Sequence, residues 1–167
     1  MRNDLTAERL RYLMRYMPEN GQFIRISRSG VGAHSLSERP AGTITRKGYR
    51  EIRVDGKLYY AHRLAWLFMT SCWPSAFVDH IDLNKDNNSW YNLREATNSQ
   101  NGANRSLYKN NVSGLKGVHQ TEYGRYVAQI RKDGTVRYIG TYDTRELANA
   151  AYEKAALELH GEFARTS

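Results

Sequence analysis

Two Asp-Gly dipeptides constrain the fold of this chain more than any other feature of its sequence. Each separates two stretches with strand-like alternation: 49–54 and 58–60 around Asp55-Gly56, and 125–131 and 136–139 around Asp133-Gly134. An Asp-Gly pair in this setting favours the two-residue turn of a β-hairpin, because both residues tolerate positive φ angles. A helical pattern follows each hairpin. The sequence therefore predicts the α+β class, with similar hairpins that are not copies of one another.

The first half of the chain shows further patterns. The apolar spacing of 4–17 predicts a short helix, and 62–70 predicts a second one. Residues 23–26 predict a strand. The stretch 27–47 is rich in Ser, Gly and Arg, so we expect a loop there.

A helix is also expected near the C-terminal end. Asp143 is predicted as its N-cap, with Glu146 three residues later completing a capping box. Gly161 is a plausible stop signal. The apolar residues expected on one face of this helix are Leu147, Ala151, Ala155 and Leu159.

The overall charge favours a polyanionic partner. The 167 residues have a formal net charge of +8 and a sequence pI near 9.7, which favours nucleic acid or an anionic membrane surface. No apolar run approaches the roughly 18 residues that span a bilayer, and the first residues lack an apolar signal segment. We therefore expect an intracellular protein with no membrane partner.

Cysteine usage excludes some classes of site. Cys72 is the single cysteine in a chain that is 40% hydrophobic and 25% charged, a composition typical of folded soluble domains. One cysteine forms no internal disulfide and cannot build a cysteine-based zinc finger. We expect Cys72 to be a small core residue.

The polar segment that follows Phe77 contains the side chains that phosphodiester hydrolysis requires. Asp79-His80 leaves an apolar strand and enters a loop rich in Asn and Asp, with Asn92 and Asn101 beyond. A histidine is a suitable general base near neutral pH. Carboxylate and amide oxygens can bind a hard divalent cation that neutralises the phosphate and the departing oxygen. An asparagine can fix the orientation of the imidazole.

These residues resemble a known family, the HNH homing endonucleases of phages and introns, in the variant with Asn at the third position. The upstream stretches 42–50 and 60–66 resemble the lead-in to that motif, and the likeness covers roughly residues 10–105. It implies a ββα-metal core. It further implies that His80 is the general base, that Asp79 and Asn101 bind one Mg²⁺ or Mn²⁺ ion, and that Asn92 braces the loop and orients His80.

Two other interpretations concern this half of the chain. Asp82, Asn84, Asp86 and Asn88 alternate like a calcium-binding loop. An EF-hand needs Gly at its sixth position and Glu at its twelfth, whereas this chain has Asn87 and Leu93 there, so turn-forming residues explain the pattern better. His62 opens a helix with an apolar face; a structural role is favoured, and an auxiliary role at the site remains the alternative.

The C-terminal part is the more basic one. Between residues 102 and 140 lie seven Lys or Arg residues and two acidic residues, a net charge of +5. In the strand 125–131, alternate side chains point to opposite faces. Tyr126, Ala128 and Ile130 are expected to face a helix, and the outward residues form a basic face. Such a sheet can enter the major groove of DNA.

Residues 112–164 resemble the plant ethylene-response-factor (APETALA2) type of DNA-binding domain. The matching stretches are 115–118, 125–131, 138–144 and 148–161. The resemblance implies a three-stranded antiparallel sheet packed on one helix, with DNA bound by the sheet. The residues predicted to bind DNA are Lys116, His119, Arg125, Gln129, Arg131 and Tyr138. Arg137 alternates with Tyr138 and is left as a possible phosphate contact. Sequence preference does not transfer, because His119, Thr121, Tyr123 and Val136 replace the usual Arg or Trp residues.

Together these patterns predict an HNH domain over 1–105 with an N-terminal extension, a linker over 106–115 and a sheet-plus-helix domain over 116–167. The predicted function is metal-dependent cleavage of double-stranded DNA, as a nick or a double-strand break, without a small-molecule cofactor. Alternatives are a DNA-binding protein with a relic HNH core, and a nuclease or binding protein for RNA. Monomer and dimer are both compatible with the sequence.

Overall fold

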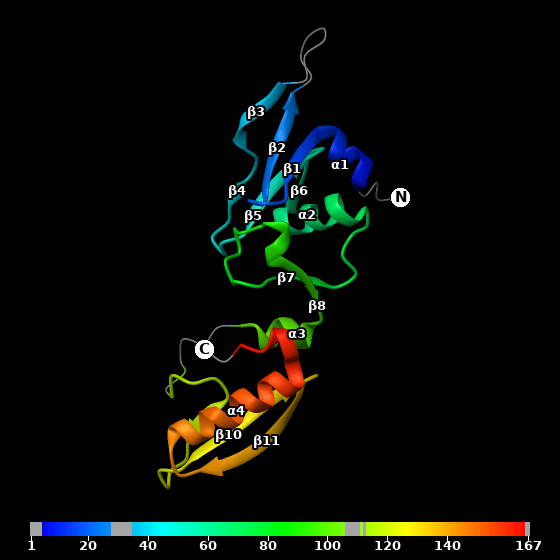
Figure 1. Cartoon of the computed structure of the whole chain (residues 1–167). Helices are drawn as coiled ribbons and strands as arrows, with labels where there is room; N and C mark the ends of the chain where they lie inside the picture. The colour runs from blue at the N-terminus through cyan, green and yellow to red at the C-terminus, as the bar shows by residue number, and fades with distance from the viewer. Residues whose placement is uncertain (1–4, 28–34, 106–110, 112, 166–167) are drawn as a thin grey trace. The chain divides into compact units, whose positions relative to one another are not determined.

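The computed structural model describes residues 5–27, 35–105, 111 and 113–165, and Figure 1 shows the order of the elements along the chain. The chain divides into two compact units, which we call unit 1 (Met1–Glu95) and unit 2 (Ala96–Ser167). The described residues form a mixed fold of four α-helices and several small sheets, in agreement with the predicted α+β class. The domain limits expected at 105 and 116 stay a prediction.

Unit 1 begins with a helix that is shorter than the sequence predicts. α1 (Ala7–Leu13) starts at Thr6, whose side chain accepts a hydrogen bond from the backbone N–H of Arg9, and it ends before the extended residue Met14. The strand β1 (Met14–Met17) follows directly. The prediction of one helix over 4–17 was wrong here, because Met14 and Tyr16 both enter the core, a spacing of two that only a strand provides.

The strands of unit 1 form two three-stranded sheets. One has the order β1-β2-β3, with β2 (Gln22–Ser27) pairing antiparallel to both neighbours, and the other has the order β4-β5-β6. The remaining bounds are β3 (Ser35–Pro40), β4 (Thr43–Ile44), β5 (Arg50–Val54) and β6 (Lys57–Tyr60). The loop predicted over 27–47 is thus partly strand. Its residues 28–34 lie outside the described residues.

Both predicted hairpin turns are confirmed. Asp55 and Gly56 have φ angles of 45° and 80°, and Asp133 and Gly134 have φ angles of 50° and 82°. Two consecutive positive φ angles define the turn whose twist matches that of the flanking strands. Asp-Gly is therefore the feature that determines the register of both hairpins.

A helix closes the core of unit 1. α2 (Ala61–Thr70) follows β6 and buries Leu64 and Leu67 among the side chains of α1, β2 and β5. It ends at Ser71, whose φ of 64° is left-handed. Cys72 comes next and is exposed. The expected core position was wrong, because Cys72 lies just beyond the end of α2, next to the exposed residues Thr70 and Ser71.

The last elements of unit 1 surround the predicted catalytic segment. β7 (Phe77–His80) and β8 (Leu93–Ala96) form a two-stranded sheet, and the short 3-10 helix η1 (Trp90–Asn92) precedes β8. α3 (Asn98–Ala103) follows, starting with a capping box made by Thr97 and Gln100. The order strand, loop, strand, helix matches the predicted ββα arrangement. By its packing, α3 belongs to unit 2.

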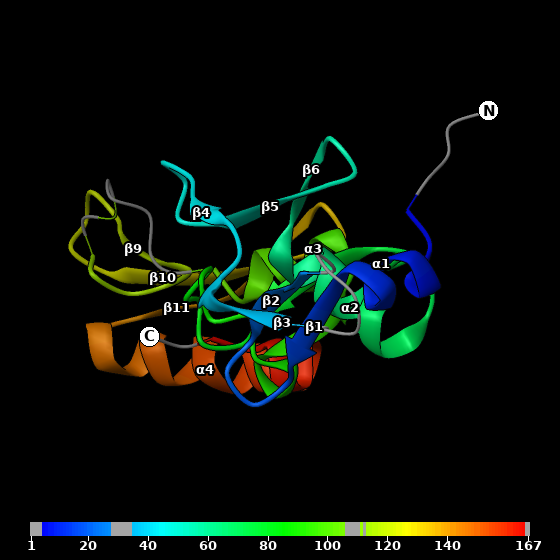
Figure 2. The same cartoon turned by 90° about the horizontal axis from the view of Figure 1, so that it is seen from above.

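Unit 2 is a three-stranded sheet with a helix along one face, as Figure 2 shows from a second direction. The sheet has the order β11-β10-β9 and is antiparallel throughout. Its strands are β9 (Val118–Gln120), β10 (Tyr126–Lys132) and β11 (Thr135–Tyr142). Ala128 and Ile130 are buried under the helix, so the predicted alternation of β10 is confirmed.

The helix of unit 2 differs from the prediction in two details. α4 (Arg145–His160) has Thr144 as its N-cap, because the Thr144 side chain accepts the backbone N–H of Leu147. Asp143 instead forms an ion pair with Arg125. The buried residues of α4 are Ala148, Tyr152 and Ala156, whereas Leu147 is 55% exposed.

The inward face of α4 is therefore rotated by about one residue from the predicted one, with Leu159 still packed against the core of unit 2. The predicted stop is confirmed, since Gly161 is the C-cap of α4. The short 3-10 helix η2 (Gly161–Phe163) follows. Among the described residues, no helix combines the length and apolar character that crossing a bilayer requires.

Candidate active site

His80 is the last residue of β7, and its ring contacts Asn88, which the sequence placed only in the alternating Asp and Asn pattern. The imidazole is 4% exposed, and its Nε2 lies 3.3 Å from Oδ1 of Asn88. Nδ2 of Asn88 donates to the backbone oxygen of Asp86 at 2.9 Å, which fixes which end of the amide faces His80. An amide oxygen only accepts hydrogen bonds, so Nε2 of His80 is the donor.

Asn88 is itself locked in position. It is 1% exposed, and its backbone oxygen accepts a hydrogen bond from the Tyr16 hydroxyl at 2.7 Å. Burial raises the pKa of Tyr16, so this hydroxyl remains a donor at neutral pH. Gly21 packs against the same peptide, because a Cβ there would lie 2.1 Å from the carbonyl carbon of Asn88. The first strand hairpin of unit 1 therefore supports the residue that orients His80.

The electrostatic setting keeps the His80 ring neutral. Burial lowers the pKa of His80, and this effect exceeds the opposing influence of the Asn88 hydrogen bond and of Asp82 and Asp79. A neutral imidazole is the form that can accept a proton from water. The location and protonation state of His80 thus suit a general base.

Asn92 braces the loop between β7 and β8. Its Oδ1 accepts the backbone N–H of Asp82 at 3.0 Å, and its Nδ2 donates to Oδ1 of Asp82 and to the backbone oxygen of Asn87 at 2.9 and 2.8 Å. Burial alone would raise the pKa of Asp82, but the hydrogen bonds from Asn87, Asn92 and Asn84 together lower it. The bracing role predicted for Asn92 agrees with these bonds. Asn88 contacts Nε2 of His80, and the predicted role of Asn92 in orienting His80 stays a prediction.

The alternating Asp and Asn residues of this loop are turn formers. Oδ1 of Asp82 accepts the backbone N–H of Asn84, and Oδ1 of Asn84 accepts that of Asp86. Asp86 also forms an ion pair with Arg50, with Nε 2.7 Å from Oδ1. Side chains that bond the backbone two residues ahead stabilise turns, so these contacts support the interpretation preferred over a calcium loop.

Asp79 is a buried carboxylate paired with an arginine. It is 6% exposed, and Nε and Nη2 of Arg94 both lie 3.2 Å from its Oδ2. A buried charge requires such a partner. Arg94 is the third residue of the Asn92-Leu93-Arg94 block, to which the sequence assigned no role of its own.

His62 lies beside His80 in a cluster of rings. The two imidazole centroids are 5.1 Å apart in an edge-to-face arrangement, and Tyr49 and Tyr60 lie within 5.4 Å of the His62 centroid. His62 is 7% exposed, and its Nδ1 has no hydrogen-bond partner among the described residues. Burial, then the charges of His80 and Arg63, lower the pKa of His62 to about 3. His62 is therefore an uncharged ring that packs against the candidate base.

The two residues predicted as metal ligands belong to different units. Asp79 is in unit 1, whereas Asn101 is half-buried on α3 in unit 2. Their carboxylate and amide oxygens are the hard donors that Mg²⁺ and Mn²⁺ prefer, so the residue types fit such an ion. In the described part of the chain, no group of three or more His, Cys, Asp or Glu side chains could hold a metal.

In unit 2, four of the six residues predicted to bind DNA share one face. Gln129 pairs with Tyr138 and Arg131 with Val136 across β10 and β11, and His119 pairs with Val127 across β9 and β10. Paired residues point to the same side of a sheet. We call this side, away from α4, the open face. Its predicted DNA-binding residues His119, Gln129, Arg131 and Tyr138 are all exposed.

The other two predicted residues lie elsewhere. Arg125 precedes β10 and pairs with Asp143, with Nε 2.9 Å from the carboxylate in a solvent-exposed setting. Lys116 is half-buried before β9, and its Nζ donates to the backbone oxygens of Ala103 and Arg105. The sequence missed this position because both carbonyls lie 11 or more residues away along the chain. A DNA-binding role for Lys116 stays a prediction.

Comparisons with known proteins point to one family. Residues 59–103 match the family described as HNH endonuclease. The chain is 43% identical over 120 residues to "Uncharacterized HNH endonuclease L560" of Acanthamoeba polyphaga mimivirus, covering 71% of this chain and 62% of that protein. It is 31% identical over 122 residues to "Protein 3.8" of Escherichia phage T7, covering 72% of this chain and 98% of that protein. The chain thus spans less than two thirds of the mimivirus relative.

A third similarity is shorter. The chain is 43% identical over 53 residues to "Ethylene-responsive transcription factor FZP" of Oryza sativa subsp. japonica, which is 30% of this chain and 17% of that protein. The predicted resemblance to plant DNA-binding domains is therefore supported over a short stretch.

Proposed function

Because the chain belongs to the family of Escherichia phage T7 Protein 3.8 and contains an HNH endonuclease domain over residues 59–103, we propose that it cleaves phosphodiester bonds in duplex DNA with one divalent metal ion. The observation on which this proposal depends is the state of His80. Its ring is buried at the end of β7 and is kept neutral, with Nε2 donating to Asn88. An imidazole prepared in this way can remove a proton from a water molecule.

His80 acts as the general base in this proposal. In its neutral form the imidazole of His80 accepts the proton of the attacking water. Asn92 acts indirectly by bracing the loop through Asp82. General-base catalysis of this kind contributes roughly 10²- to 10⁴-fold to a rate.

Asp79 and Asn101 are the proposed ligands of the metal ion. HNH nucleases generally use a divalent ion, and oxygen donors of these two types suit Mg²⁺ or Mn²⁺. When bound, such an ion supplies positive charge that stabilises the phosphate and the departing oxygen. Arg94 balances the charge of the buried Asp79 carboxylate and restrains its orientation.

The open face of unit 2 is the proposed DNA-binding surface. Support comes from the exposed Arg131, Gln129, His119 and Tyr138 on one side of a sheet, and from the short similarity to plant transcription factors. Cationic side chains bind the phosphate backbone, and polar or aromatic side chains on a sheet can contact bases.

A plasmid-cleavage assay tests the proposed function. Wild-type protein should nick or linearise supercoiled plasmid in Mg²⁺ and not in EDTA. His80→Ala should cut at least about 100-fold more slowly while its affinity for duplex DNA stays within twofold. Tyr91→Ala is the matched control, because this side chain is in the same segment and is 77% exposed; it should cut like the wild type.

Two outcomes would contradict the proposal. If wild-type protein binds duplex DNA but never cuts it with Mg²⁺ or Mn²⁺, the HNH domain is a relic in a DNA-binding protein. If structured RNA displaces duplex DNA at fixed salt and is itself cut, the substrate is RNA, whose backbone attracts basic faces equally.

A further inference from the structure

We propose that Lys116 is a positioning residue, which ties α3 to the sheet of unit 2 and thereby sets the location of Asn101. The inference rests on the proposed function in one respect, since it takes Asn101 as a metal ligand. It assigns to Lys116 a role different from the DNA contact that the sequence predicts.

α3 cannot fix its own location by apolar packing. The helix has six residues, Asn98–Ala103, and none of them is buried. Helices of this length are marginal in water without external support. Its capping box satisfies the first turn but gives no contact with the rest of unit 2. α3 also contacts η2, and hydrogen bonds from other segments of unit 2 add to that contact.

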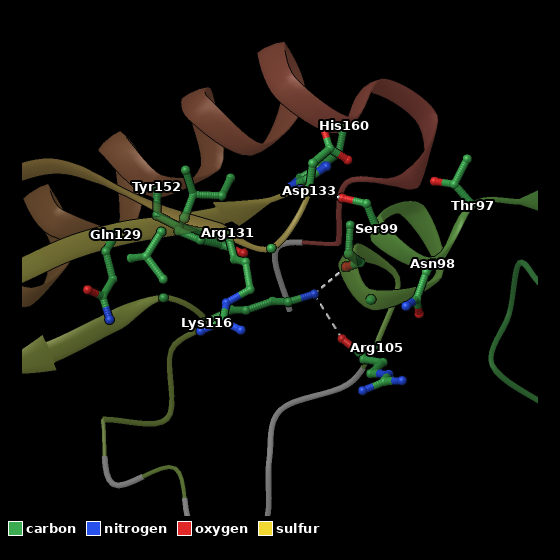
Figure 3. Close-up of a pocket in the computed structure, with 16 residues that line it drawn as sticks. Thr97, Asn98, Ser99, Arg105, Lys116, Gln129, Arg131, Asp133, Tyr152 and His160 are labelled. Atoms are coloured by element: carbon green, nitrogen blue, oxygen red, sulfur yellow. Dashed lines mark hydrogen bonds between the residues drawn. The ribbon is translucent and has the colours of Figure 1, made fainter.

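Hydrogen bonds from the segment before β9 and from the β10–β11 turn reach both ends of α3. At the C-terminal end, Nζ of Lys116 donates to the backbone oxygens of Ala103 and Arg105, the latter at 2.9 Å (Figure 3). At the N-terminal end, the backbone N–H of Asp133 donates to Oγ of Ser99 at 3.0 Å. Asp133 lies in the β10–β11 hairpin turn, so this bond ties the first turn of α3 directly to the sheet.

A cavity separates much of α3 from the sheet, so the hydrogen bonds that cross it contribute to holding the helix in place. A space of about 830 Å³ opens between α3 and the β10–β11 hairpin (Figure 3). Asn98 and Ser99 of α3, Arg131 of β10 and also Lys116 line it. The bonds from Lys116 and Asp133 bridge this opening. A cation is also favourable at the carbonyl end of a helix.

The backbone next to Lys116 is fixed by close packing. The next residue, Gly117, is so tightly packed that a Cβ there would lie 2.3 Å from the Tyr152 ring and 2.4 Å from the Gln129 oxygen. The backbone at this point is thus fixed between α4 and β10. Burial, and then the charge of Arg165, lower the pKa of Lys116 to about 8, which agrees with an ammonium directed into the protein.

The consequence concerns the metal ion rather than the DNA. Asn101 lies between the two ends of α3 that accept these hydrogen bonds. The position of its amide is therefore fixed relative to the sheet of unit 2. Residues that orient metal ligands typically change metal affinity by roughly 10- to 100-fold when they are mutated. Removing the Lys116 ammonium should therefore weaken metal binding and leave the open face unchanged.

The test is Mn²⁺ binding by the full chain with duplex DNA, followed by electron paramagnetic resonance. The chain has the His80→Ala background, so the DNA stays intact. Lys116→Met should weaken Mn²⁺ binding about 10-fold or more and keep the Kd for duplex DNA within twofold. Lys116→Arg should restore most of the Mn²⁺ affinity. Lys154→Met, which removes an exposed lysine of α4, should change neither quantity.

Two results would overturn the inference: weaker DNA binding with unchanged Mn²⁺ affinity, or no change in either. If circular dichroism shows that Lys116→Met does not fold, Ser99→Ala replaces it, because it removes the hydrogen bond between α3 and Asp133. We expect Ser99→Ala to weaken Mn²⁺ binding several-fold. An unchanged Mn²⁺ affinity would contradict the proposal that these hydrogen bonds position Asn101.

Asn101→Ala separates this inference from the proposed function. If Asn101→Ala leaves Mn²⁺ binding intact, the proposed metal site fails and the inference fails with it. If Asn101→Ala weakens Mn²⁺ binding and Lys116→Met does not, only the positioning role fails.

Discussion

The two regions to which function is assigned use polar residues in opposite ways. In the loop between β7 and β8 of unit 1, Asn88 and Asn92 are buried and bond the backbone or Asp82. On the open face of unit 2, Gln129, Arg131 and their neighbours point to solvent. Proton transfer needs atoms at fixed positions, whereas docking on a phosphate backbone needs accessible charge.

This difference predicts which property, stability, catalysis or DNA binding, a mutation in each region should change. A buried polar network loses much of its stability when one member is disturbed, because the partners stay desolvated. Exposed charges contribute little to folding and can be removed without loss of structure. Substitutions in the loop should therefore lower stability and catalysis together, and substitutions on the open face should lower binding alone.

The largest effect is expected at Gly21. Alanine there would place a Cβ 2.1 Å from the carbonyl carbon of Asn88, at a φ of +72°. We expect Gly21→Ala to destabilise unit 1 by about 3 kcal/mol or more, since overpacking and backbone strain each cost roughly 1–3 kcal/mol, and to abolish cutting. Urea unfolding measures the change.

Gly56→Ala is the control for Gly21→Ala. Gly56 has a similar φ of +80°, but nothing lies within 4 Å of its Cβ position, so only the conformational cost of about 1 kcal/mol remains. Equal losses in the two variants would mean that the packing against Asn88 is unimportant.

An intermediate effect should appear in the pH dependence of stability. The pKa of folded His62 is lowered to about 3, while an unfolded histidine titrates near 6.5. Between these values the unfolded state binds a proton that the folded His62 does not. Stability is therefore complete above about pH 6.5 and falls as the pH drops through this window, by up to about 1.4 kcal/mol per pH unit.

His62→Phe should remove this part of the acid sensitivity, because phenylalanine keeps the buried ring without a titrating nitrogen. Unfolding free energies measured from pH 7.5 to 4.5 give the slopes. His119→Phe, at an exposed position, is the control and should follow the wild-type slope. Identical slopes for the wild type and His62→Phe would contradict the burial of a neutral His62.

The smallest effect is expected on the open face. Arg131→Ala should weaken duplex binding by about 1 kcal/mol and reduce the dependence of log K on log salt by about 1. Arg137→Ala is the comparison, because Arg137 pairs with Ile130 and so points to the opposite side of the sheet. Titrations at several salt concentrations measure both slopes. A larger loss of affinity for Arg137→Ala than for Arg131→Ala would mean that DNA binds the side of the sheet opposite the open face.

Features that depend on local chemistry could be predicted from the sequence. The turns at Asp55-Gly56 and Asp133-Gly134, the stop at Gly161 and the alternation of β10 all follow from neighbouring residues. The order Asp79-His80, Asn92 and Asn101 fell on the strand, loop and helix that the family resemblance implies.

Features that depend on residues far apart in the chain could not be predicted from the sequence. β1 and the third strand of its sheet require pairing with β2, which no local pattern reveals. The Tyr16 hydroxyl supports Asn88 from 72 residues away, and Lys116 meets the carbonyls of Ala103 and Arg105 only in the folded chain. The cap at Thr144 was missed by one residue because Asp143 has the same capping chemistry and an alternative partner, Arg125.

One measurement tests most directly whether unit 1 cuts the DNA and the open face of unit 2 binds it. Affinity and single-turnover cleavage of the same labelled duplex are measured for two variants: His80→Ala, and a double variant with Gln129 and Arg131 both changed to alanine. The account predicts that His80→Ala binds like the wild type and does not cut. The double variant should bind weakly but cut at a near wild-type rate once protein is saturating. A double variant that fails to cut when fully bound, or a His80→Ala protein that cuts normally, would contradict it.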